Sequence, residues 1–165
     1  MSEETPWLSS EQLRAWMALN AMIEILPAAI DVQLKRDAGL NGFEYVVLAG
    51  LSEAPGRALP MTDLAVFATG SRSRLSHAVD RMERKGWVTR RPAETAGRRM
   101  EAVLTDAGMA KVVAAAPGHV REARRLVIDA LDDKEIAQLD TIARTIVATA
   151  APELRTMLEE HSPSA

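Results

Sequence analysis

The order in which periodic segments follow one another constrains the fold of this chain more than any other feature. Apolar residues recur at helical steps of three and four towards both ends, whereas the candidate strands lie in the middle, at 57–61, 87–91 and 100–104. The predicted order is α-α-β-α-α-β-β-α-α. Two helices joined by a tight turn and followed by a hairpin indicate a mainly α chain with a small β-hairpin wing, a winged helix-turn-helix.

Capping residues indicate where the predicted helices begin. Ser9 and Gln12 form a capping box at the start of the first helix, and Pro27 should kink this helix without ending it. Thr62 is expected to cap a short helix that ends near Ala68. Further caps are predicted at Asn41, Ser71, Thr105 and Asp132.

The chain is expected to form a single domain, residues 1–165, with two regions. Residues 42–105 would make the winged helix-turn-helix, and residues 9–36 and 106–160 would make a helical region that is interrupted at Pro117-Gly118. The flanking helices carry more apolar surface than a small winged helix can cover. We therefore expect two copies of the chain to pair through them as a homodimer.

Composition excludes several classes of protein. The chain has no cysteine, which removes disulfides, thiolate catalysis, zinc–thiolate sites and any thiol-oxidation switch. No apolar run approaches the roughly 18 residues that cross a bilayer, and the N-terminus lacks the basic and apolar segments of a secretory signal. A soluble, cytoplasmic protein with no membrane partner is expected.

Charge is distributed unevenly along the chain. The net charge is −3, but the segment from Arg57 to Arg99 holds ten Lys/Arg against four Asp/Glu, a local charge of +6, which leaves −9 for the remainder. A positive middle between negative arms indicates that one surface faces an anion.

The helix from Ser71 to Gly86 has two faces. Leu75, Ala78, Val79 and Met82 fall in one narrow arc, and polar and basic side chains fall in a neighbouring one. Small caps followed by long hydrogen-bond donors are what a recognition helix in the major groove requires. The predicted contacts of this helix with double-stranded DNA are Ser71, Arg72, Ser73, Arg74, Ser76, His77 and Arg81.

The predicted hairpin carries a second set of cations. Arg90 and Arg91 end one strand, and Arg98 and Arg99 lie beside the loop that contains Gly97. Such a loop suits the minor groove, where the negative potential is enhanced. The alternative is that these arginines pair with Asp80, Glu83 or Glu94, and some of both is expected. Asp80 in particular should orient an arginine, because a carboxylate is repelled by phosphates.

These residues resemble a known family. Leu64-Ala65, the segment GSRSRLSHAVDRMERKGWVTRR and the segment AGRRMEAVLTDAG are similar to the winged-helix core of the MarR family of bacterial transcription regulators. The resemblance extends roughly from Leu8 to Leu158. It implies a homodimeric DNA-binding regulator, usually a repressor, that is often released from DNA by a small aromatic or phenolic ligand. The two-fold symmetry of the expected dimer independently predicts a near-palindromic operator. Ala96 stands where the family usually has an acid in the wing turn.

Two further sets of residues have competing interpretations. Trp16 and Met17, with Trp7 and Met22, could line a cavity for an aromatic ligand or could simply fill the core or a dimer interface. His119 and His161 have no partner at metal-ligand spacing, so solvated or capping roles are expected rather than a metal site. No cofactor is expected.

Two other function classes were weighed against DNA binding. Ser73, His77 and Asp80 contain the three chemistries of a catalytic triad, but side chains at these steps of one helix rarely converge on a substrate, and no enzyme is expected. The alternative is a dimeric helical adaptor whose winged helix binds a protein partner. The positive middle segment with its arginine-rich hairpin favours DNA.

Overall fold

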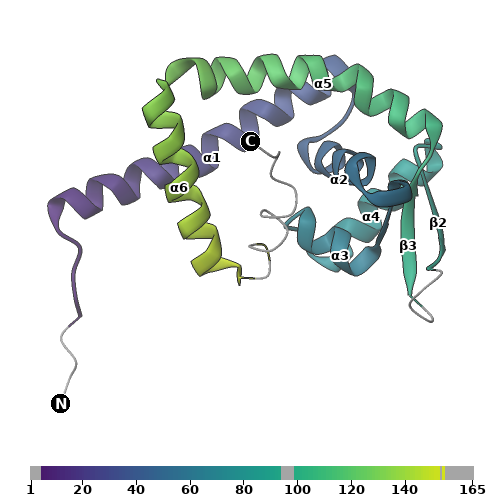
Figure 1. The fold of residues 1–165 in the computed structure, drawn as a ribbon, viewed down its shortest axis with the longest axis horizontal. Coiled ribbons are helices and arrows are strands. Elements are labelled where there is room, and N and C mark those ends of the chain that lie inside the picture. The colour runs from purple at the N-terminus through teal and green to yellow at the C-terminus, as the bar shows by residue number, and fades with distance from the viewer. Residues whose placement is uncertain (1–4, 94–98, 153, 155–165) are drawn as a thin grey trace.

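The computed structural model of the protein describes residues 5–93, 99–152 and 154, and is mostly helical with a small three-stranded antiparallel sheet (Figure 1). The elements are α1 (Ser10–Ala38), α2 (Gly42–Glu53), β1 (Ala58–Pro60), α3 (Met61–Phe67), α4 (Arg72–Arg84), β2 (Val88–Pro92), β3 (Met100–Leu104), α5 (Asp106–Leu126) and α6 (Asp133–Ala150), with short 3-10 turns at Pro55–Arg57 and Ile128–Ala130. This order confirms the predicted one.

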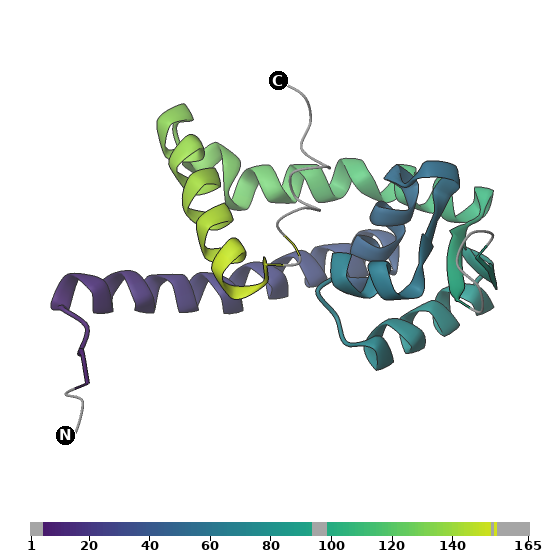
Figure 2. The same cartoon turned by 60° about the horizontal axis from the view of Figure 1, so that its bottom comes forward.

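Helix α1 begins as the sequence predicts and continues through its proline. Ser9 Oγ accepts a hydrogen bond from the Gln12 backbone N–H, and the Gln12 side chain accepts one from the Ser9 N–H. The helix runs past Pro27 and stops at Gly39, whose φ of +60° is the left-handed conformation that glycine adopts without strain. The N-terminal half of α1 extends away from the rest of the molecule (Figures 1 and 2).

The apolar character of α1 corrects one expectation from the sequence. Among the described residues, α1 is long and apolar enough to cross a membrane by length and composition, and none of its apolar window is buried. No uninterrupted apolar run of this length exists in the sequence, because charged residues divide it. Averaged over 18 residues, however, this part of α1 is apolar, since it contains only two charged side chains.

Helix α5 is continuous, so the predicted interruption at Pro117-Gly118 was wrong. Proline at position 117 removes one N–H, and the carbonyl that it leaves without a partner belongs to Val113. Val113 and Pro117 both lie on the exposed side of α5, where water can bind that carbonyl. Packing against α1 and α2 stabilises the helix despite the lost hydrogen bond.

Helix α3 starts earlier than predicted, so the assignment of Thr62 as its cap was also wrong. The helix begins at Met61, directly after Pro60, the last residue of β1. Thr62 therefore lies inside the first turn, and its hydroxyl donates to the Asp63 carboxylate at 2.9 Å.

The sheet has the strand order β1-β3-β2, in which both pairs are antiparallel. The predicted hairpin β2–β3 is confirmed, and its register pairs Val88 with Leu104 and Pro92 with Met100. The short extended segment β1 adds a third strand by pairing Ala58 with Val103.

One hydrophobic core surrounds α2 and is formed with α3, α4, the sheet, the C-terminal part of α1 and the N-terminal half of α5. Figure 2 shows α4 and α5 on opposite sides of this part of the molecule. Its largest fully buried apolar side chains are Leu34, Leu40, Leu48, Leu51, Leu64, Leu75, Met82, Val47, Val79 and Val88. The core therefore fixes α4 and the hairpin β2–β3 relative to each other and leaves the outer face of α4 free for solvent.

Candidate nucleic-acid interface

Helix α4 presents the two faces that the sequence predicted. Ser71 caps it by accepting a hydrogen bond from the Arg74 backbone N–H at 3.1 Å. Leu75, Ala78, Val79 and Met82 are buried against the core. The exposed predicted contacts are Ser71, Arg72, Ser73, Arg74 and His77, whereas Ser76 and Arg81 are partly buried. One side of α4 is thus anchored and the other carries donors.

Arg74 is exposed but not loose. Its guanidinium carbon lies 4.2 Å from the centroid of the Phe43 ring, a cation–π contact with the first turn of α2. The capping hydroxyl of Ser71 holds its backbone N–H. Arg74 is therefore set on the surface with a defined direction.

Arg81 is more constrained than the sequence suggested. Its Nε donates to Glu44 Oε1 at 2.9 Å, and its Nη1 donates to the carbonyl of His77 at 3.3 Å. Glu44 is only 4% exposed, and the sequence predicted it as the capping partner of Asn41 but not as a partner of Arg81. The chain gives no local signal for this pair because the two residues are 37 positions apart.

Arg90 joins the hairpin to α4. Its guanidinium binds the carboxylates of Asp80 and Glu83 and the carbonyl of Ser76, and its backbone N–H donates to Glu83 at 2.9 Å. The hydrogen bond from Arg90 holds the pKa of the Asp80 carboxyl below its ordinary value, and the arginine's charge adds to the effect. The expectation that Asp80 orients an arginine is confirmed, and Arg90 lies in the protein rather than projecting from it.

Of the remaining hairpin arginines, Arg91 and Arg99 belong to the described residues and Arg98 does not. Arg91 pairs with Glu101 on β3 while remaining half exposed. Arg99 is exposed, and its carbonyl accepts a hydrogen bond from the Ala93 N–H at 2.8 Å, which closes the base of the loop. Arg98, with Ala96 and Glu94, lies outside the described residues.

His119 corrects another expectation. It is neither a solvated histidine nor a cap: its ring contacts that of Tyr45 in a tilted arrangement with centroids 4.4 Å apart, and its Nδ1 is buried without a hydrogen-bond partner in the described chain. Burial lowers the pKa of the imidazole, so the ring favours its neutral form. The reason is that this part of α5 packs against α1 and α2.

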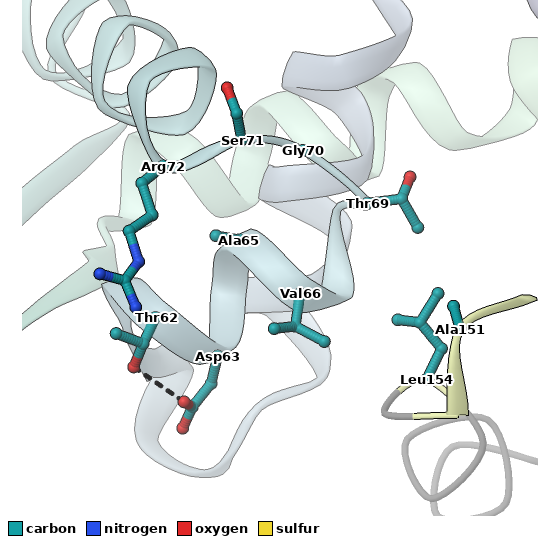
Figure 3. Close-up of a pocket in the computed structure, with 10 residues that line it drawn as sticks. All are labelled: Thr62, Asp63, Ala65, Val66, Thr69, Gly70, Ser71, Arg72, Ala151 and Leu154. Carbon is teal, nitrogen blue, oxygen red and sulfur yellow. Dashed lines mark hydrogen bonds between the residues drawn. The ribbon is translucent and has the colours of Figure 1, made fainter.

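Cavities lie beside the start of α4, where Ser71 and Arg72 contribute to the lining, and between the flanking helices. One, of about 630 Å³, lies between the α3–α4 turn and the chain after α6, where Ala151 and Leu154 face Val66 and Thr69 (Figure 3). The other, of about 410 Å³, lies between α1, the end of α5 and α6. Its lining is mainly apolar and includes Met22 and Leu26 but not Trp16 or Met17, which are 54% and 64% exposed.

Comparison with known proteins gives this arrangement a family. Residues 38–99 match the model of the MarR family. The structure is similar to that of Sco3205, a MarR family transcriptional regulator from Streptomyces coelicolor solved in complex with DNA, with 38% identity, a TM-score of 0.86 and coverage of 92% of this chain and 94% of that one. None of the curated proteins matches the chain.

A second solved structure agrees. AbsC, a MarR family transcriptional regulator from Streptomyces coelicolor, is 34% identical, has a TM-score of 0.80, and covers 92% of this chain and 99% of its own. The similarity extends over the arms, that is, the flanking helices α1, α5 and α6, as well as over the winged helix. This chain therefore belongs to the MarR family of transcriptional regulators.

Proposed function

We propose that the protein is a homodimeric repressor that reads a near-palindromic DNA operator with α4 and releases it when a small aromatic or phenolic ligand binds. The single observation that carries this proposal is the exposed row of donors on α4, opposite a buried apolar face. A relative with 38% identity over most of the chain was solved in complex with DNA, which supports DNA binding by this chain.

The major-groove contacts in this proposal come from the first two turns of α4. Ser71, Ser73 and Arg74 lie next to the helix N-terminus, whose free N–H groups also favour a phosphate. Arg72 and His77 extend the same exposed surface, and Ser76 and Arg81 lie at its margin. Arginine can hold guanine O6 and N7 with two hydrogen bonds, so Arg74 is the proposed reader of a base.

The hairpin contacts in this proposal have unequal weight. Arg99 is exposed and, with Arg98, is proposed to contact the minor groove or the backbone. Arg91 is shared with Glu101, which weakens its attraction for phosphate. Arg90 is bound by two carboxylates and a carbonyl, so its proposed part is to hold the hairpin against α4.

The proposed dimer rests on the apolar surface of the arms. A single protomer leaves large apolar side chains of α1 and α6 exposed, namely Leu13, Trp16, Met17, Ile23, Ile25, Ile142 and Ile146. A second copy would cover them and account for the membrane-like composition of α1. Two-fold symmetry would place two α4 helices about one turn of DNA apart.

The proposed ligand response uses the arms. The apolar cavity of about 410 Å³ between α1, α5 and α6 is large enough for a small aromatic molecule and supports a ligand there. Trp16 and Met17 do not line this cavity in one protomer, and we propose that they contact the ligand in the dimer, where a second copy would cover them. A ligand between the arms would change the spacing of the two α4 helices, and both half-sites could no longer be bound together.

Fluorescence anisotropy with the promoter of the protein's own coding region tests this function. We expect tight binding at low salt that weakens steeply as salt rises, because phosphate contacts release counterions. Random duplexes should bind far more weakly. Absence of binding at low salt would contradict the proposal and favour the protein-binding adaptor.

A further inference from the structure

The first turn of α2 contacts the recognition helix through two consecutive side chains. The Phe43 ring lies 4.2 Å from the Arg74 guanidinium, and Glu44 Oε1 lies 2.9 Å from Arg81 Nε. Arg74 and Arg81 are seven residues apart in α4, which is about two helical turns, so they lie on the same side of the helix. One short segment therefore holds two arginines at a fixed spacing.

The environment of Glu44 favours a permanent ion pair with Arg81. Its side chain is almost fully buried, its Oε2 accepts the Asn41 backbone N–H at 3.2 Å, and its ion pair in the described chain is with Arg81. A buried carboxylate without a cation is strongly unfavourable. Arg81 therefore stays beside α2 when α4 meets another molecule.

The bound guanidinium of Arg81 retains one edge for a partner. Nε is taken by Glu44 and Nη1 by the carbonyl of His77, while no partner is found for Nη2 among the described residues. The side chain is 42% exposed. Arg81 can thus donate outward from a fixed position, which differs from a flexible surface arginine.

Phe43 is fixed as well. A Cβ placed on Gly70 would lie 2.5 Å from the Phe43 ring, so the ring is packed against the turn that precedes α4 on one side and meets Arg74 on another. The first turn of α2 is itself tied to α1, because Asp31 accepts the Gly42 backbone N–H at 2.9 Å.

We propose that Phe43 and Glu44 are positioning residues for DNA recognition. They hold Arg74 and Arg81 so that α4 meets the DNA with two preoriented guanidinium groups, which lose less conformational freedom on binding than free side chains do. This inference rests on the proposed DNA-binding function and deepens it: sequence discrimination by α4 depends on the first turn of α2, which itself need not touch DNA.

Glu44→Gln tests the role of the carboxylate. The amide oxygen can still accept the Asn41 N–H and keep the capping box, but the charge that holds Arg81 is lost. Affinity for a duplex that the wild type selects from a randomised library should fall about tenfold, the effect of losing one charge-assisted hydrogen bond. Affinity for random duplexes should stay unchanged.

A matched control comes from α5. Glu122 pairs with Arg125 at 2.7 Å, away from α4, so Glu122→Gln makes the same chemical change without touching the recognition helix. It should leave both affinities at the wild-type level. An equal loss in Glu122→Gln and Glu44→Gln would overturn the proposal, because a general change of charge would then explain it.

Double-mutant cycles separate positioning from a structural effect. In an Arg81→Ala background, Glu44→Gln should cause no further loss of discrimination, because the group that it acts through is gone. Phe43→Leu should behave likewise with Arg74→Ala, with a smaller loss of about two- to fivefold that matches an exposed cation–π contact. Additive losses in both cycles, or unchanged discrimination in both single variants, would overturn the proposal.

Arg81→Lys keeps the test valid if Glu44→Gln unfolds. Lysine preserves the charge beside Glu44 but removes the outward Nη2, so the variant should fold and lose discrimination. Full discrimination by Arg81→Lys would contradict the proposal. A wild type that selects no duplex at all would instead contradict the DNA-binding function itself, so the two failures are distinguishable.

Discussion

Individual arginines in the positive segment differ in what already binds them. Arg90 is held by Asp80, Glu83 and a backbone carbonyl, and Arg81 by Glu44, whereas Arg74 rests on an aromatic ring that does not neutralise its charge. An arginine whose charge is not compensated by a neighbouring carboxylate attracts a base or a phosphate more strongly. Arg74 is thus the strongest single candidate for sequence readout.

Arg74→Ala should weaken binding to the selected duplex by roughly 1–3 kcal/mol, the usual contribution of a bidentate contact with guanine. Anisotropy titrations with selected and random duplexes measure the difference. Arg125→Ala on α5 is the control, because Arg125 pairs with Glu122 and lies outside α4. An equal loss on random DNA would show that Arg74 contacts phosphate only.

Gly108 is required by close packing. A Cβ there would lie 2.1 Å from the carbonyl oxygen of Trp87, so Gly108→Ala forces α5 away from the start of β2. We expect a loss of about 1–3 kcal/mol in the free energy of unfolding, measured by urea denaturation. Gly42→Ala is the matched control, since its Cβ would meet only Asp31 at 3.8 Å, and a similar loss there would refute the steric explanation.

At the scale of elements, the wing and the recognition helix form one unit. Arg90 on β2 binds α4 at three places, and Thr105 at the start of α5 donates to the carbonyl of Gly86. The hairpin is therefore held against α4, and the relative placement of these two elements does not depend on the loop.

The Asp80–Arg90 contact predicts a pH dependence of stability. Because the folded-state pKa of Asp80 is below its ordinary value of 3.8, its contribution is complete above that pH and is lost as pH falls through the folded-state pKa. Asp80→Asn should thus be less stable than the wild type at neutral pH, and the difference should shrink in acid. Thermal unfolding from pH 7 to pH 2 checks this. A difference independent of pH would contradict the assigned ion pair.

The elements also show what the sequence could reveal. Caps such as Ser71 and the buried face of α4 were predictable because local spacing determines them. The continuity of α5 through Pro117 was not, since tertiary packing along α1 outweighs the lost hydrogen bond. The ion pair between Glu44 and Arg81 was not predictable for a similar reason, because the two residues are distant in sequence. A glutamate at the third position of a helix predicts only a capping role.

At the scale of the whole molecule, charge and apolar surface are separated. The positive segment 57–99 holds α4 and β2, the residues on either side of it carry the negative balance, and α1 and α6 expose large apolar side chains. In the proposed complex, the negative charge outside segment 57–99 would be repelled by the phosphates and would favour an approach through the positive segment. The apolar arms then remain available for a second copy.

Ile23→Asp together with Ile146→Asp should prevent dimerisation, because each places a charge on an exposed apolar face. Sedimentation velocity should give a dimer for the wild type and a monomer for the variant, with unchanged helical content by circular dichroism. The control, Arg144→Gln on α6, should stay dimeric. A monomeric wild type would contradict the proposed role of the arms.

The most direct test of the account is the footprint of the wild-type protein on the duplex that it selects, combined with the stoichiometry of the complex. A dimer that reads DNA with two α4 helices predicts two half-sites related by a two-fold axis, about 10 base pairs apart, with two protomers bound. A single unrepeated site bound by one protomer, or equal protection of every sequence, would contradict it.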